Sequence, residues 1–244
     1  MVVLNKRYTF QVGQAPANER TLTLTSASNE GYFISLRPFV QPNASEKEFP
    51  FEWGFAGSPA SAKMGKKDAE TDTVDFDFEF DTNVHLNLEN THRGVIKTLW
   101  KTWESGLVEE RGQVFPFGDD KEGFDFFELW QPLDSTRPGF VVLDDNSADQ
   151  EKARSVVLTV DTDEYKGLVT VVGRWAQGIL FKKSENTING INFLRAVEQQ
   201  EGSWKTLLQY GSDFSKFPKS FVASLDSAVE GNSGLTWRVV ESNI

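Results

Sequence analysis

The stretch TVDFDFEF, residues 73–80, alternates apolar and acidic side chains at each step from Val74 onward. Successive side chains of a β-strand point to opposite faces of a sheet, so a period of two predicts a half-buried strand. Val74 and three phenylalanines would face a core, and the acidic residues would face solvent. Leucine and threonine alternate in the same way from Arg20 to Thr25. Together the two stretches predict a chain dominated by β-strands.

Other segments share this pattern and are separated by turn residues. Ser26–Gly31 is rich in residues that favour turns, so the apolar residues after it predict a hairpin with the strand before it. The further predicted strands are residues 32–36, 84–88, 95–108, 155–160, 168–175 and 235–240.

One segment, Ile191–Val197, has apolar residues at spacings near three and four, which indicate a helix. Thr187 or Asn189 would cap its start, and Gly202 would end it. A second short helix or turn is predicted within Lys216–Leu225.

Two polar segments predict long loops. Residues 57–72 are rich in Ala, Ser, Lys and Gly, and residues 144–152 are acidic and polar. Both are longer than the ~2–5 residues of a hairpin connection, so we expect flexible or regulatory loops.

The two halves of the chain carry features in a similar order. In each half an aromatic-rich strand precedes a proline, a strand that begins with Arg, a glycine turn and a segment with Trp and Gly. The repeat predicts two copies of one β-unit, each closing on itself to remove sheet edges. Gly, Pro and charged residues cluster at Arg111–Gly123. We therefore expect an N-terminal β-barrel domain at residues 1–112 and a C-terminal one at residues 113–244.

The chain has a formal net charge of −11 and no cysteine. Such an acidic surface repels phosphate backbones and anionic lipids, so nucleic-acid binding is not expected. The absence of cysteine excludes disulfides, thiolate metal sites and a cysteine nucleophile. The first residues do not form a signal peptide, and the sequence has no run of ~18 apolar residues, so we expect no membrane insertion. The expected location is the cytoplasm, with access to the nucleus.

Histidine is scarce, and His85 and His92 are its two occurrences. Neither belongs to a zinc-binding or metalloprotease spacing. The sequence also lacks a G-x-S-x-G elbow and the glycine-rich loops that bind phosphate. We therefore predict no catalytic residue, no metal site and no cofactor, and expect that the protein is not an enzyme.

Paired carboxylates are the strongest enzymatic alternative. Glycosidases place two carboxylic acids on either side of the scissile bond. Glu52 lies beside Trp53 and Glu104 beside Trp103, and together with the pair Glu109-Glu110 they could line a groove. However, a chain with 36 acidic residues contains such neighbours by chance, so a carbohydrate-active protein ranks third among the alternatives.

The 20 phenylalanines and 7 tryptophans allow two other functions. If they line a barrel, its interior could hold a small hydrophobic ligand. If they fill the barrels instead, the protein would act through its surface. Aromatic residues concentrate at Phe115–Gly118 and Phe124–Trp130, near the expected junction, where they would either pack between the domains or bind a partner.

A set of short motifs is distributed along nearly the whole chain, from Tyr8 to Glu241. The motifs are Phe10–Gly13, Asn18–Thr21, Ile34–Val40, Phe49–Trp53, Asp81–Val84, Asn90–Gly94, Pro116–Gly118, Glu128–Pro132 and Gly173–Trp175. In their order and spacing they resemble the fungal Hri family, yeast proteins named for interaction with a casein-kinase-I-type protein kinase.

The resemblance implies an all-β fold of two tandem lipocalin-like antiparallel β-barrel domains with one or two short helices. It implies binding to a casein-kinase-I-type protein kinase and, as a second partner, to an endoplasmic-reticulum translocon subunit. It also implies a cytoplasmic and nuclear location and no catalytic activity. It assigns no role to individual residues.

Kinases of this type favour Ser or Thr with an acid three residues earlier. Ser147 follows Asp144 at this spacing, and Thr71 follows Asp68. Both would lie in the predicted loops, so we expect them to be candidate phosphorylation sites.

Overall fold

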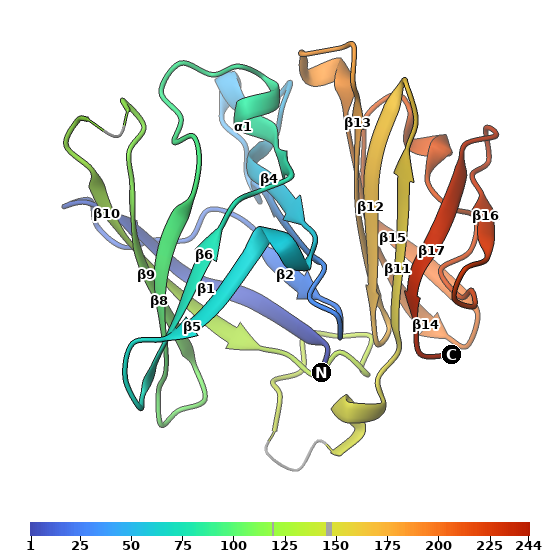
Figure 1. Ribbon diagram of the computed structural model, residues 1–244, viewed down its shortest axis with the longest axis horizontal. Helices are drawn as coiled ribbons and strands as arrows, with labels where there is room; N and C mark the ends of the chain where they lie inside the picture. The colour runs from blue at the N-terminus through green and yellow to red at the C-terminus, as the bar shows by residue number, and fades with distance from the viewer. Residues whose placement is uncertain (119, 145–147) are drawn as a thin grey trace.

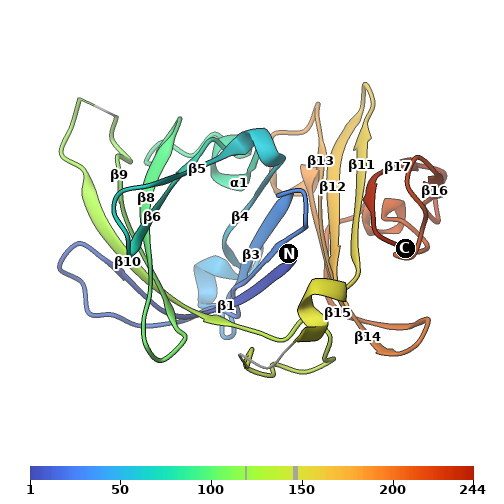
Figure 2. The ribbon, with the colours of Figure 1, turned by 60° about the horizontal axis from the view of Figure 1, so that its bottom comes forward.

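Two curled antiparallel sheets make up most of the chain (Figures 1 and 2). The computed structural model describes residues 1–118, 120–144 and 148–244. The first sheet contains β1 (Val3–Val12), β2 (Leu24–Ala27), β3 (Phe33–Pro38), β4 (Phe51–Gly57), β5 (Ala62–Lys66), β6 (Thr71–Phe76), β7 (Phe80–Asp81), β8 (Ile96–Thr102), β9 (Val108–Val114) and β10 (Phe124–Pro132). The second contains β11 (Ser155–Asp161), β12 (Tyr165–Val172), β13 (Trp175–Lys182), β14 (Ile191–Gln200), β15 (Ser203–Tyr210), β16 (Ala228–Glu230) and β17 (Thr236–Ser242).

Each sheet bends into a half-barrel. In the described residues the strand orders are β5-β6-β8-β9-β10-β1-β2-β3-β4-β7 and β15-β14-β13-β12-β11-β17-β16. Pairing is irregular between Arg7 and Thr9 on β1 and between Arg37 and Pro38 on β3. Such bulges increase the local twist of a strand and so help to curl the sheet. The predicted all-β class with two tandem barrel-like units is confirmed.

The two half-barrels share a hydrophobic core. The outer face of β2–β4 packs against the second sheet, and the two sheets lie side by side in Figure 1. The buried residues of this shared core are Ile34, Leu36, Phe51, Ala56 and Phe80 from the first half and Val157, Leu168, Ile179, Phe181, Ile191 and Phe193 from the second. A separate core fills the second half-barrel around Trp237.

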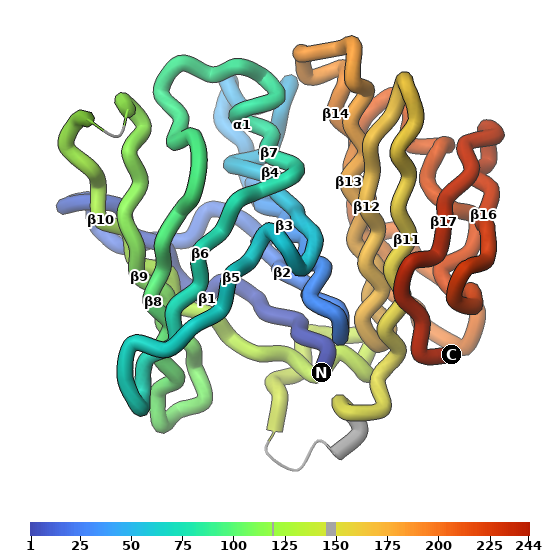
Figure 3. The backbone as a smooth tube through the Cα atoms, viewed as in Figure 1, coloured from blue at the N-terminus to red at the C-terminus, as the bar shows by residue number. Residues whose placement is uncertain are grey.

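The passage from one sheet to the other lies later in the chain than the expected domain boundary. Residues 112 and 113 fall inside β9, which pairs with β10 in the first sheet. The first sheet ends at Pro132, and the second begins at Ser155. Figure 3 shows the described parts of the intervening segment, residues 133–144 and 148–154, below the two sheets.

The predicted helix at Ile191–Val197 is wrong, because these residues form the strand β14. Residues 191–198 are all buried, with Phe193 in the shared core and Leu194 in the core of the second half-barrel. A strand that is buried on both faces loses its alternation of apolar and polar residues. Gly202 does adopt a left-handed conformation (φ 74°), but it lies in the turn between β14 and β15.

Helical structure occurs where a strand was predicted. Within residues 84–88 the structure has the end of α1 (Thr82–His85), whose start is capped by Asp81. Short 3₁₀ segments occupy Ala44–Glu46, Pro59–Ser61, Ala148–Lys152, Ile188–Gly190 and Phe214–Lys216. The last of these touches the predicted turn or helix at 216–225. No helix in the described part of the chain is long and apolar enough to cross a membrane.

The predicted loop at 57–72 contains the edge strand β5 and the start of β6, so that prediction is wrong. β5 carries exposed residues on both faces, such as Met64, and therefore lacks the pattern of a half-buried strand. Thr71 opens β6 and pairs with Lys101. In the predicted loop at 144–152, Ser147 lies outside the described residues.

The threonine face of Arg20–Thr25 is not solvated. Thr21 and Thr23 are 4% and 0% exposed, and β2 begins only at Leu24. The Thr21 hydroxyl accepts a hydrogen bond from the buried Arg7 and is also hydrogen-bonded to the Thr23 hydroxyl, contacts that a sequence pattern of polarity does not reveal.

Candidate functional site

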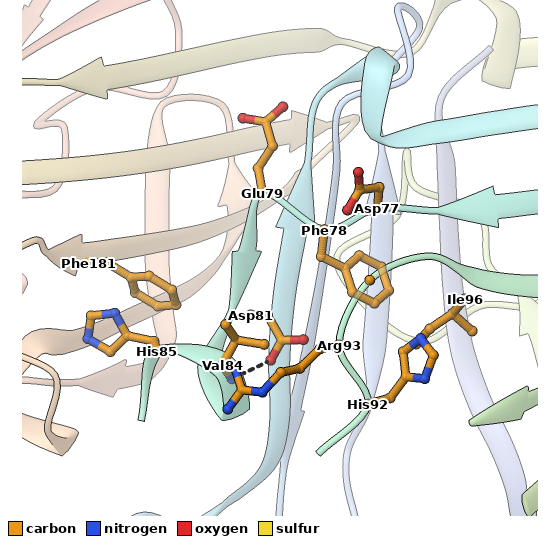
Figure 4. Close-up of a pocket in the computed structure, with 11 residues that line it drawn as sticks. Asp77, Phe78, Glu79, Asp81, Val84, His85, His92, Arg93, Ile96 and Phe181 are labelled. Carbon is orange, nitrogen blue, oxygen red and sulfur yellow. Dashed lines mark hydrogen bonds between the residues drawn. The ribbon is translucent and has the colours of Figure 1, made fainter. Parts of the chain in front are cut away.

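A cavity of about 400 Å³ opens where the first sheet fails to close, between β7 and the loop that precedes β8 (Figure 4). Phe181, from β13 of the second sheet, completes its wall. Its lining residues are Asp77, Phe78, Glu79, Asp81, Val84, His85, His92, Arg93, Gly94, Ile96 and Phe181. The mouth of a barrel and the junction of two units are common places for ligand pockets.

Asp81 joins β7 to α1 and lies at one wall of the cavity. Its Oδ1 accepts hydrogen bonds from the indole N–H of Trp53 (2.9 Å) and from the backbone N–H groups of Asn83 (2.8 Å) and Val84 (3.2 Å). Burial raises the pKa of Asp81, although these three hydrogen bonds act in the opposite direction. Its other oxygen, Oδ2, accepts no hydrogen bond from a described residue.

The two histidines are both brought to this cavity. The Nε2 of His85 donates to the carbonyl oxygen of Glu185 (2.8 Å), and its ring lies 4.4 Å from that of Phe181. Burial lowers the pKa of His85. His92 accepts a hydrogen bond from the N–H of Phe115 through Nδ1, so its Nε2 donates to the carbonyl of Val95.

Charged groups surround the opening. Glu79 accepts a hydrogen bond from the Ser58 hydroxyl and lies 3.4 Å from Lys166. Although burial acts in the opposite direction, these contacts lower the pKa of Glu79. The guanidinium of Arg93 donates to Asn87 Oδ1 and to the carbonyl of Leu88, which anchors it to the loop after α1.

Trp53 connects the cavity to the interior of the first half-barrel. Its indole N–H binds Asp81, and its ring lies 5.2 Å from the guanidinium carbon of Arg37. Phe78, on the cavity wall, packs edge-on against the same indole at 5.4 Å.

A network of buried charges fills that interior. Arg7, whose side chain has no exposed surface, forms ion pairs with Glu19 (2.6 Å), Glu52 (2.7 Å) and Glu128 (2.9 Å). Arg37 also binds Glu128, at 2.7 Å. Burial alone would lower the pKa of Arg7, but the charges of these carboxylates raise it. The Nε of Arg37 has no hydrogen-bond partner in the described part of the chain.

Glu110 is the carboxyl group of this interior that burial keeps neutral. It lies opposite Glu128 on the neighbouring strand, and Trp130 donates to its Oε2 (2.9 Å). Burial and the adjacent charge of Glu128 raise the pKa of Glu110 to about 8.

The carboxylates considered for a glycosidase are dispersed. Glu52 and Glu110 belong to the buried interior, Glu104 is exposed in the turn after β8, and Glu109 binds Arg111 on the outside of β9. No group of three or more His, Asp or Glu residues suited to a metal ion occurs among the described residues.

The aromatic residues near the expected junction separate into two groups. Trp130 is buried inside the first half-barrel, whereas Phe117 and Phe124 are 56% and 39% exposed. The latter two rings lie 6.0 Å apart, where β9 ends and β10 begins. Figure 1 places this end of the first sheet far from the second sheet, so these two residues do not pack between the halves.

The sequence drew attention to the two histidines but predicted no site role for them, and it assigned no role to Asp81 and Arg93. Both belong to motifs of the family resemblance, Asp81–Val84 and Asn90–Gly94. The signal available for Asp81 was its position before Thr82 and Asn83, which is typical of a residue that caps a helix. The cavity itself depends on the sheet failing to close, which no local pattern encodes.

The fold and the site define a class of all-β proteins in which two half-barrels share a core and one has a cavity at its mouth. The family model described as Protein HRI1 matches residues 3–241. Protein HRI1 of Lachancea thermotolerans is 63% identical over 244 residues, which are 100% of this chain and 94% of that relative. Protein HRI1 of Saccharomyces cerevisiae strain YJM789 is 48% identical over 242 residues, 99% of each chain.

A solved structure gives the same result. The crystal structure of an uncharacterized Saccharomyces cerevisiae protein superposes with a TM-score of 0.95 at 48% identity and covers 100% of both chains. The chain belongs to the HRI1 protein family, as the sequence motifs predicted.

Proposed function

We propose that this chain is a non-catalytic protein-binding protein whose partner is a casein-kinase-I-type protein kinase. The observation that carries the proposal is the exposed pair of aromatic rings, Phe117 and Phe124, at the outer end of the first sheet. The kinase as partner rests on the family resemblance, and an endoplasmic-reticulum translocon subunit is proposed on the same ground as a second partner.

The aromatic pair has the properties of an interaction site. Aromatic residues are enriched in protein interfaces, and each buries ~150–250 Å² when a partner covers it. Gly118, between them in sequence, has a φ of 108°, and its turn places Phe117 outside the sheet. Phe115 instead packs against His92, which fixes the base of the turn.

The interior of the first half-barrel supports a role that does not involve catalysis. Its carboxylates Glu19, Glu52 and Glu128 are paired with Arg7, and therefore do not face one another across an open cleft. We propose a cytoplasmic and nuclear location on the strength of the family resemblance alone.

A small hydrophobic ligand is the second candidate. A ligand-binding barrel is compatible with the cavity at the mouth of the first half-barrel. However, the buried charges of Arg7, Arg37 and Glu128 suit an apolar guest poorly, because such a guest cannot pair with them.

The test measures binding of the full-length protein to a purified kinase of this type. The double substitution Phe117→Ser and Phe124→Ser should weaken binding by about tenfold or more, as expected for aromatic residues at the centre of an interface. Val222→Ser, which removes an apolar residue that is 44% exposed on the second half, serves as a matched control with unchanged affinity.

Two results would contradict the proposal. One is that the unmodified protein does not bind the kinase. The other is that the double variant binds as tightly as the control. A thermal transition equal to that of the unmodified protein verifies that each variant is folded. The same titration with the translocon subunit tests the second partner separately.

A further inference from the structure

We propose that the cavity between β7 and β8 binds a small organic cation, an ammonium group carried on an apolar or aromatic body. The site goes beyond the proposed interaction with a kinase, which uses a different end of the first sheet. It is argued from free hydrogen-bond acceptors, from the balance of charge and from the aromatic walls of the cavity.

The first argument is the supply of unused acceptors. The Oδ2 of Asp81 has no described partner, because all three donors bind Oδ1. His85 donates through Nε2, so in its neutral form Nδ1 is left as an acceptor. The side chain of Asp77 has no ion pair with a described residue. A ligand that fits these groups must donate hydrogen bonds, as an ammonium does.

The second argument is the balance of charge. Three carboxylates line the cavity, namely Asp77, Glu79 and Asp81, against the one guanidinium of Arg93. Arg93 forms no ion pair within 4 Å with a described residue, since its described bonds go to Asn87 and Leu88. Lys166 lies 3.4 Å from Glu79 and offsets its charge, so one negative charge is left over. A single cation therefore restores neutrality, whereas an anion would increase the imbalance.

The third argument is the apolar part of the wall. Phe78 presents its ring toward the cavity in Figure 4, and Phe181 lies on the opposite side with His85. Aromatic faces attract cations within about 6 Å of the ring centre. Ile96 and Val84 add aliphatic surface that would cover the body of the ligand.

The size of the cavity limits the ligand. Drug-sized ligands occupy pockets of about 300–1,000 Å³. A volume near 400 Å³ lies at the lower end of that range, which suits one ring or a short chain with a single ammonium group. The walls come from both sheets, so the ligand would also contact the junction of the two halves.

The experiment uses 2-phenylethylammonium as the probe and titrates it into the full-length protein by calorimetry. 3-Phenylpropionate, of similar size and opposite charge, is the matched control probe. The ammonium should bind, and the carboxylate should bind at least tenfold more weakly. Equal binding of both probes, or tighter binding of the carboxylate, would overturn the proposal, as would the absence of ammonium binding at millimolar concentration.

Two variants with opposite expected effects locate the site. Asp81→Asn keeps Oδ1 as the cap of α1 but replaces the free oxygen with a donor, so the ammonium should bind at least tenfold more weakly. Arg93→Gln removes a repelling charge, so the ammonium should bind about twofold to tenfold more tightly. Glu104→Gln, in the remote turn after β8, should leave the affinity unchanged.

The pH dependence gives an independent readout on the unmodified protein. Protonation of Asp81 removes the charge that attracts the ammonium, so affinity should fall as the pH is lowered through the raised pKa of Asp81. An affinity that is constant with pH, or that is unchanged in both Asp81→Asn and Arg93→Gln, would place the probe elsewhere and refute this site.

Discussion

Arg7 and Glu110 face the same interior, and burial has opposite consequences for them. Arg7 keeps its charge because Glu128, Glu19 and Glu52 surround it. Burial and the adjacent negative charge of Glu128 favour the neutral form of Glu110, although the hydrogen bond from Trp130 acts in the opposite direction. Removing one partner from such a network typically costs ~3–5 kcal/mol, because the other charge is left buried and unpaired.

The substitution Glu110→Gln should stabilise the protein increasingly as the pH rises. In the folded chain Glu110 holds its proton up to about pH 8, whereas unfolded it ionises near 4.5. Between these values folding takes up a proton, so the free energy of unfolding of the unmodified protein falls with rising pH. Glutamine removes this loss and should add at least about 1 kcal/mol near neutral pH.

Urea titrations at several pH values between these limits measure the effect. The curve of stability against pH should be flatter for Glu110→Gln than for the unmodified protein. Glu104→Gln, at an exposed position, should follow the unmodified protein. Parallel curves for the unmodified protein and Glu110→Gln would show that Glu110 is ionised in the folded chain.

At the scale of elements, the sequence predicted the strands that have one face in solvent and the strands that are a continuous apolar run. It failed at β14, where the burial of both faces gave Ile191, Leu194 and Val197 the spacing of a helix. It failed at β5, where exposure of nearly every residue resembled a loop. These two errors share a cause, because alternation reports a difference between two faces and disappears when both faces have the same environment.

The candidate site was predictable only in part. The cap that holds Asp81 is local in sequence, and so leaves a signal. The residues that complete the wall of the cavity are far from Asp81 in the sequence, since Phe181 comes from the other half of the chain. The exposed rings of Phe117 and Phe124 were recognised as unusual, but their distance from the second sheet required the structure.

β4 approaches β14 so closely that Gly54 has no room for a side chain. A Cβ atom at this position would lie 2.5 Å from the ring of Phe193 and 3.3 Å from Thr82. Gly54→Ala should therefore destabilise the protein by about 1–3 kcal/mol, the usual cost of overpacking a core. Gly139→Ala, where no atom lies within 4 Å of the added Cβ, is the matched control.

Thermal or urea unfolding of both variants measures the difference. A Gly54→Ala protein as stable as Gly139→Ala would show that the two sheets are separated more widely than described. The comparison isolates the contact between the elements because both substitutions add the same methyl group.

At the scale of the whole molecule, polar groups as well as apolar ones join the halves. Arg195, from β14, donates to the carbonyl oxygens of Leu22 and Leu36 in the first half. Burial without a neighbouring carboxylate lowers the pKa of Arg195 to about 9. Glu241, near the end of the chain, accepts hydrogen bonds from Ser28 and from the backbone of Asn29.

The two halves should consequently unfold together. Separating them would expose the shared core around Ile34 and Phe193 and leave Arg195 without its carbonyl partners. Differential scanning calorimetry of the intact chain should show one transition, with equal calorimetric and van't Hoff enthalpies. Two resolved transitions would contradict this expectation and would mean that each half-barrel is stable alone.

The pairing of β1 with β10 has a consequence for synthesis on the ribosome. Val3–Val12 is made first, but its neighbour Phe124–Pro132 follows only after more than a hundred intervening residues. The apolar face of β3 waits longer still, until β12 and β13 of the second sheet have been made. During translation the nascent chain therefore carries a strand with one unpaired edge and an uncovered apolar face, the two features that make an emerging polypeptide depend on chaperones.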